Sequence, residues 1–129
     1  MKITELKKQV EIWAKDHLVN IAIYNKSFNN FIEINQNGIN HTINAKRLEQ
    51  KDLLSIYKLK EILNKATYKG VEKPNHEDRE NVINCHIFNT ITIINGVKYK
   101  VRIVVREISV NAKDKNKHFF YHHTLIEKA

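Results

Sequence analysis

Apolar residues near the N-terminus recur at spacings of three and four, which predicts one amphipathic helix over roughly residues 3–18. A second stretch, residues 53–66, repeats the pattern and predicts another helix with Gly70 as its C-terminal stop. Its apolar face carries Leu53, Ile56, Leu59, Leu63 and Ala66. Between the two helices, residues 20–34 hold two short runs typical of strands, and Asn37-Gly38 predicts a turn.

The last third of the chain is typical of β-structure. Two apolar-rich runs, residues 85–94 and 97–108, flank Asn95-Gly96, a strong hairpin signal. We expect a three-residue loop that pairs Ile93 with Val97, because this register gathers the isoleucines and valines on one face. Helices first and an antiparallel sheet after them predict an α+β fold. At 129 residues the chain has the size of a single domain.

In this register the opposite face of the hairpin collects cations at every second position. They are Lys98, Lys100, Arg102 and Arg106. Their expected neighbours on the other strand are His86, Phe88, Thr90 and Thr92. A solvated sheet face is the simpler interpretation. Because this face carries no acid before the strands end, the pattern favours a surface that binds phosphates.

A final strand is predicted over roughly residues 117–127, and it carries His118, His122 and His123. Alternation divides this strand into two sets that are both partly apolar, so periodicity leaves open which set faces the core. If Tyr121 and Leu125 are core, His122 and Thr124 share the open face with Arg102 and Arg106.

Composition narrows the chemistry. The chain has 22 Lys and Arg against 14 Asp and Glu, a net charge of +8 that favours polyanionic partners. Its single cysteine excludes an internal disulfide, and no apolar run is long enough to span a membrane. With three glycines and no metal-ligand motif, neither a glycine-rich phosphate loop, a cofactor nor a metal is expected.

Histidines combined with Arg, Lys, Tyr and Thr suit metal-independent cleavage of RNA. A neutral imidazole takes a proton from the 2′-hydroxyl, an imidazolium gives one to the leaving 5′-oxygen, and a cation stabilises the phosphorane. The product of such a reaction is a 2′,3′-cyclic phosphate. No metal is required, because RNA carries its own nucleophile.

Three segments carry a resemblance to a known family: GINHTI, a helix ending in YKGVE, and FNTITIINGVKYKVRIVVREI followed by Tyr-x-His-x-Leu at residues 121–125. Together they resemble the nuclease-like domains of the barnase–EndoU–colicin–RelE group, found in bacterial toxins and in polyvalent proteins of phages and mobile elements. The resemblance covers about 90 residues and leaves residues 1–35 unmatched. It implies an α+β fold with the nucleic-acid site on the open face of the sheet.

The resemblance also implies that His41 and His123 match the family's histidines, with Arg102 and Arg106 as strand cations. We therefore expect His41 to transfer one proton and His122 or His123 the other, with Tyr121 and Thr124 as further candidates. The expected phosphate contacts are Lys46, Arg47, Lys98 and Lys100. These features predict a small endoribonuclease, a toxin or mobile-element effector that acts in the cytoplasm of the producing cell or of a target cell.

Two other functions fit the same composition. A basic nucleic-acid-binding module would use the cations without the histidines, and an inhibitor or structural partner would make the charge incidental. If the chain is a toxin, an acidic immunity or antitoxin protein is the expected partner for its basic face.

Overall fold

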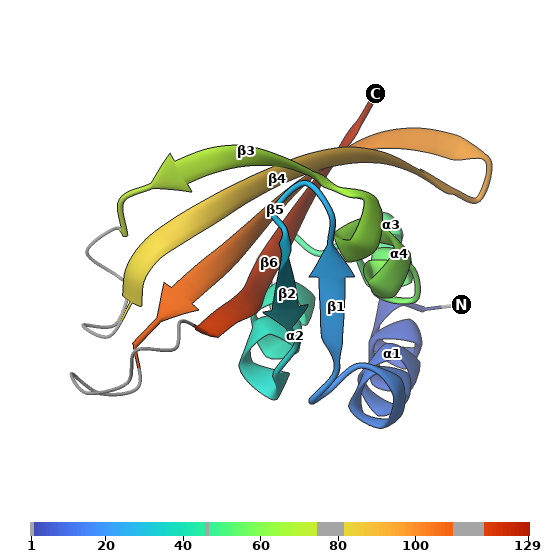
Figure 1. The fold of residues 1–129 in the computed structure, drawn as a ribbon. Coiled ribbons are helices and arrows are strands. Elements are labelled where there is room, and N and C mark those ends of the chain that lie inside the picture. The colour runs from blue at the N-terminus through green and yellow to red at the C-terminus, as the bar shows by residue number, and fades with distance from the viewer. Residues whose placement is uncertain (1, 46, 75–81, 110–117) are drawn as a thin grey trace.

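The computed structural model describes residues 2–45, 47–74, 82–109 and 118–129. The expected α+β class is confirmed: within these residues, four helices accompany one six-stranded sheet. The elements are α1 (Ile3–His17), β1 (Ala22–Asn25), β2 (Asn30–Glu33), α2 (Gln36–Ile43), α3 (Gln50–Ile56), α4 (Leu59–Lys65), β3 (Thr67–Glu72), β4 (Val82–Ile94), β5 (Val97–Ile108) and β6 (His118–Lys128). Figure 1 shows the sheet curling over the helices.

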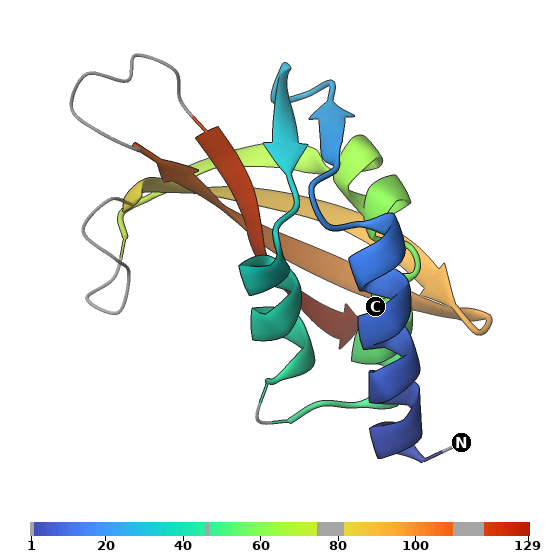
Figure 2. The same ribbon diagram turned by 90° about the horizontal axis from the view of Figure 1, so that it is seen from below.

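The strand order is β1-β2-β6-β5-β4-β3. All neighbours pair antiparallel except β2 and β6, which run parallel through Glu33 and Phe120, so the sheet is mixed. This parallel contact places α2, which follows β2, beside β6. Figure 2 shows α2 alongside α1, and a hydrogen bond of 2.7 Å from Lys7 Nζ in the N-terminal half of α1 to Oδ1 of Asn44, the C-cap of α2, joins the two helices.

The first helix and the first two strands form where the sequence predicts them. In α1 the buried residues are Leu6, Val10 and Ala14, whereas Ile3 at the start of the expected stripe is exposed. His17 lies at the end of α1, exposed, with its ring stacked on Trp13 at a centroid distance of 4.8 Å.

The turn predicted at Asn37-Gly38 is wrong, because these residues lie inside α2. Asn35 caps the helix: its side-chain oxygen accepts a hydrogen bond from Gly38 N at 3.0 Å. An Asn that could begin a turn therefore begins a helix, and Ile39 and Ile43 become its buried face. His41 thus stands on a helix rather than in a loop.

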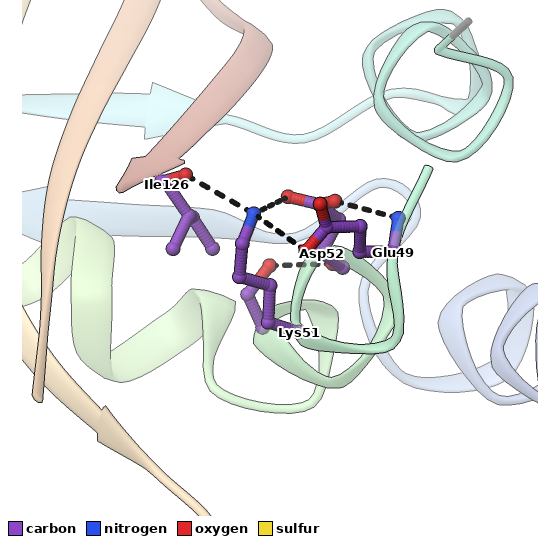
Figure 3. Close-up of polar contacts among 5 residues, drawn as sticks. Glu49, Lys51, Asp52 and Ile126 are labelled. Carbon is purple, nitrogen blue, oxygen red and sulfur yellow. Dashed lines mark hydrogen bonds and ion pairs between the residues drawn. The ribbon is translucent and has the colours of Figure 1, made fainter. Parts of the chain in front are cut away.

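The single helix predicted over 53–66 is two short helices, α3 and α4, separated at Tyr57 and Lys58. Gly70 does not end a helix; it has φ +125° at a bulge in β3, so YKGVE is a strand. Figure 3 shows how α3 is held: Lys51 Nζ contacts Asp52 Oδ1 at 3.3 Å and donates to Ile126 O at 3.2 Å, while Glu49 N–H donates to Asp52.

The predicted hairpin forms, but its expected three-residue loop is wrong. Ile94 pairs directly with Val97 across Asn95 and Gly96, which both have positive φ of 50° and 77°. This is the conformation that Asn-Gly favours in a two-residue turn. As a consequence Ile91 lies opposite Lys100 and stays 49% exposed. The conformational preference of Asn-Gly therefore sets the register of the hairpin, even though that register leaves apolar side chains on the exposed face.

Candidate active site

Three histidine rings meet at one place in the fold. His41 of α2 lies 4.1 Å from His122 and 5.1 Å from His123 of β6, measured between ring centroids. The centroids of His122 and His123 are 4.8 Å apart. His41 is exposed and the other two are half-buried, so solvent reaches the cluster. The expected convergence of His41 with the paired histidines is present in the structure.

A β-bulge in β6 explains how two consecutive histidines serve one site. Val104 pairs with His123 and Val105 pairs with Tyr121, so His122 is the extra residue. A bulge interrupts the alternation of side chains between the two faces of a strand, so two consecutive side chains can project from the same face. As a result, the side chains of Tyr121 and Thr124 both point into the core. His122 and His123, between them in the sequence, both line the cavity on the other side of the strand. This bulge resolves the ambiguity that alternation leaves in the sequence.

The contact between α2 and β6 is close enough to set the position of His41. A methyl group at Gly38 would lie 2.1 Å from Tyr121 O, so only glycine permits this approach. On the core side, the Tyr121 hydroxyl lies 2.7 Å from Thr42 Oγ1 and 2.6 Å from Thr124 Oγ1. Burial raises the pKa of Tyr121 to about 12, although both threonine contacts lower it.

Two arginines complete the surroundings of the histidines. Arg102 and Arg106 of β5 line the same cavity of about 760 Å³ as the three rings. Arg102 donates to Glu72 of β3 at 2.8 Å, so the expectation of an acid-free face is wrong at this point. On this face of β5, Val104 lies between Arg102 and Arg106. Val104 pairs with His123 of β6.

Three other cations predicted for the site, Lys98, Lys100 and Arg47, lie outside the cavity. Lys98 and Lys100 share a sheet face with Arg102 and Arg106, yet they are exposed near the hairpin turn and do not line the cavity. Arg47 is exposed after α2 and does not line it either, and Lys46 is outside the described residues.

The prediction of which β4 residues lie beside these cations is also wrong. In the observed register the cationic face pairs with Ile91, Ile93, Asn89, Ile87 and Cys85. His86, one of the expected neighbours, is buried on the opposite face, where its Nε2 lies 2.9 Å from Glu107 Oε1 and its Nδ1 lies 2.7 Å from Tyr68 Oη. His86 is thus part of the core and not of the site.

Some lining residues were missed by sequence reasoning. Asn37 and Asn40 of α2 and its cap Asn35 line the cavity, as do Glu72 at the end of β3 and Lys73 just after it. The asparagines were missed because a turn, and not a helix, was predicted at Asn37-Gly38. A helix that begins after Asn35 as its cap places Asn37, Asn40 and His41 on one face, because they are three and four residues apart.

Chemically, the cavity offers imidazoles that can accept or donate protons and guanidinium groups that can bind a phosphate. Two imidazolium rings at these separations repel each other, so a mixture of charged and neutral rings is favoured over three charged rings. A mixed pair is what acid and base catalysis by histidine requires.

Comparison with known proteins adds one relationship. The family model of the large polyvalent protein-associated domain 3 matches residues 1–121. No curated protein and no solved structure matches the chain. Among the described residues, no helix has both the length and the apolar character needed to cross a membrane.

Proposed function

The chain belongs to the large polyvalent protein-associated domain 3 family, and we propose that it acts as a metal-independent endoribonuclease, a toxin or mobile-element effector whose working groups are His41 and the histidines of β6. The single observation that carries the proposal is the convergence of His41 with His122 and His123 beside Arg102 and Arg106. The sequence resemblance to nuclease-like domains supports the same chemistry.

In the proposed reaction, a neutral imidazole removes the proton of the 2′-hydroxyl and the oxygen attacks the adjacent phosphorus. The 5′-oxygen leaves with a proton from an imidazolium, which yields a 2′,3′-cyclic phosphate and a free 5′-hydroxyl. Arg106 and Arg102 hold the non-bridging oxygens and offset the charge that develops on them. Each proton transfer contributes roughly 10²–10⁴ in rate.

We assign the two proton-transfer roles to His41 and His123. His123 pairs with Val104, between the two arginines on the same face, where a bound phosphate would lie. His122 is the bulged residue and packs closest to His41, which suits a positioning role for the His41 ring. With ring centroids 5.1 Å apart, a phosphate enters between His41 and His123 only if the exposed His41 ring turns outward.

Tyr121 and Thr124 act through position in this proposal. The Tyr121 hydroxyl is hydrogen-bonded to both Thr124 and Thr42 on the core side of β6, so this group holds α2 against the strand instead of contacting RNA. Lys98 and Lys100 contribute to long-range attraction of the polyanion, which depends on ionic strength.

The face of β4, β5 and β6 beyond the cavity also suits the expected acidic immunity or antitoxin protein. Ile91, Ile93 and Leu125 are each about half exposed there, next to Lys98 and Lys100. Apolar side chains beside cations are complementary to a partner that presents acids around an apolar centre.

The test is cleavage of a mixed RNA substrate in EDTA by the wild type and by His41→Ala. The proposal expects cleavage that survives chelation and falls by about 10²–10⁴ in His41→Ala. His17→Ala is the matched control, because it also removes an exposed helical imidazole and leaves the cavity untouched. Salt-sensitive binding of RNA without cleavage would support a nucleic-acid-binding module instead.

A further inference from the structure

We propose that His41, His122 and His123 also form a three-imidazole site for a divalent transition-metal ion, Zn²⁺ being the probe of choice, and that the bound ion inhibits the nuclease. Binding of the ion follows from the side-chain geometry alone. Only its inhibitory effect rests on the proposed function.

The ligand geometry requires little change. One nitrogen from each of the three rings lies within 4.8 Å of the other two. Zn–N bonds of 2.0–2.1 Å in a tetrahedral site place ligand nitrogens roughly 3.3 Å apart, so the widest pair must close by about 1.5 Å. His41 is exposed, so its side chain can rotate toward the other two rings, and the bulge already places the rings of His122 and His123 side by side, with centroids 4.8 Å apart.

The donor set selects the class of metal. Imidazole nitrogen suits Zn²⁺, Ni²⁺ and Cu²⁺, whereas Mg²⁺ and Ca²⁺ require oxygen ligands. Three protein ligands leave a fourth position open for water or an anion. Arg102 and Arg106 line the same cavity and favour an anion in that position.

Metal binding and proton transfer compete for the same lone pairs. An imidazole that coordinates Zn²⁺ through its basic nitrogen can neither accept the proton of the 2′-hydroxyl nor carry one to the leaving oxygen. Because ligands must be deprotonated, metal affinity falls as the pH drops through the imidazole range. The same three rings would therefore hold either protons or a metal ion.

The experiment is titration of the untagged, metal-free chain with Zn²⁺ by calorimetry, followed by Co²⁺ absorption spectroscopy. We expect one ion per chain, at least tenfold weaker binding in His41→Ala, and unchanged binding in His17→Ala and His118→Ala. Circular dichroism checks that each variant is folded. Equal affinity in His41→Ala and wild type, or no binding up to millimolar Zn²⁺, overturns the site.

A second arm separates this inference from the nuclease proposal. Added Zn²⁺ should stop RNA cleavage in proportion to occupancy, and EDTA should restore it. If Zn²⁺ stimulates cleavage, the inhibitory role is wrong. If no RNA is cleaved under any condition, the nuclease proposal fails while the calorimetric result still decides the metal site.

Discussion

The Thr42 and Tyr121 hydroxyl oxygens lie 2.7 Å apart, and each of these residues is the chain neighbour of a histidine in the cluster. Thr42 follows His41, and Tyr121 precedes His122. This contact therefore fixes the axial position of α2 along β6 on the buried side while the imidazoles meet on the other side. The catalytic geometry that we propose depends on a small polar link inside the core.

Replacing Tyr121 by Phe removes this link and leaves the Thr42 and Thr124 hydroxyls without it. We expect the free energy of unfolding to fall by about 1–3 kcal/mol, measured by urea unfolding at pH 7. RNA cleavage should fall as well, because α2 can then shift along β6. An unchanged unfolding midpoint would contradict the role assigned to this contact.

The same substitution should alter the alkaline limb of stability. The pKa of Tyr121 is about 12 in the folded chain and near 10 when unfolded, so the unfolded state loses the proton first. The contribution of Tyr121 to the free energy of unfolding is fully present below pH 10. Unfolding free energy should then fall by about 1.4 kcal/mol per pH unit between pH 10 and 12. Tyr121→Phe should lack this component, as the difference between the two pH profiles will show.

Gly38→Ala tests the close approach of α2 to β6. The added methyl would lie 2.1 Å from the Tyr121 carbonyl oxygen, so the helix must move away. We expect a loss of about 1–3 kcal/mol in unfolding free energy, together with weaker RNA cleavage. Asn37→Ala, at an exposed position of the same helix, is the stability control and should change little. Equal stability of both variants would refute the tight contact.

A designed disulfide tests the register of the β4–β5 hairpin. In a Cys85→Ala background, Ile91→Cys with Lys100→Cys should oxidise readily, because the two residues are directly opposite. Thr90→Cys with Lys100→Cys is the matched pair that a three-residue loop would favour. Mass spectrometry under mild oxidation distinguishes them. Preferential oxidation of the Thr90 pair would show that the two-residue turn is wrong.

The roles of the adjacent histidines can be separated by pH profiles. His123→Ala should lose roughly 10²–10⁴ in cleavage rate and one limb of the bell-shaped profile, since it removes a proton-transfer group. His122→Ala should lose less and keep both limbs, because His122 positions His41. The opposite assignment holds if His122→Ala, and not His123→Ala, loses a limb.

Much of the fold follows from local patterns in the sequence. The stripe of α1 and the strand-turn-strand around Asn95-Gly96 are strong signals, because each depends on near neighbours. The predicted hairpin register was wrong because it assumed that Ile91 and Ile93 must be buried, whereas both are exposed. Single apolar side chains are common on protein surfaces, and Asn-Gly has a specific conformational preference that should have been given more weight.

The sequence named residues that the fold brings together, but it did not give their geometry, and it also named Thr124, Arg47, Lys98 and Lys100, which do not line the cavity. His41, His122, His123, Arg102 and Arg106 were expected, and all five line one cavity. The bulge at His122 breaks the alternation on which the choice between His122 and His123 depended, and no local signal marks it. The helix at 36–43 depends on the Asn35 cap and on packing of Gly38 against Tyr121, which is a tertiary contact.

The most direct test of the central claim uses a short oligonucleotide that contains one ribonucleotide among deoxyribonucleotides, incubated with the chain in EDTA. Mass analysis of the products reports the chemistry at a single bond. The proposed mechanism predicts cleavage at that ribonucleotide, a 2′,3′-cyclic phosphate end, and no cleavage of the fully deoxy strand. An intact ribonucleotide strand, or equal cleavage of both strands, would contradict it.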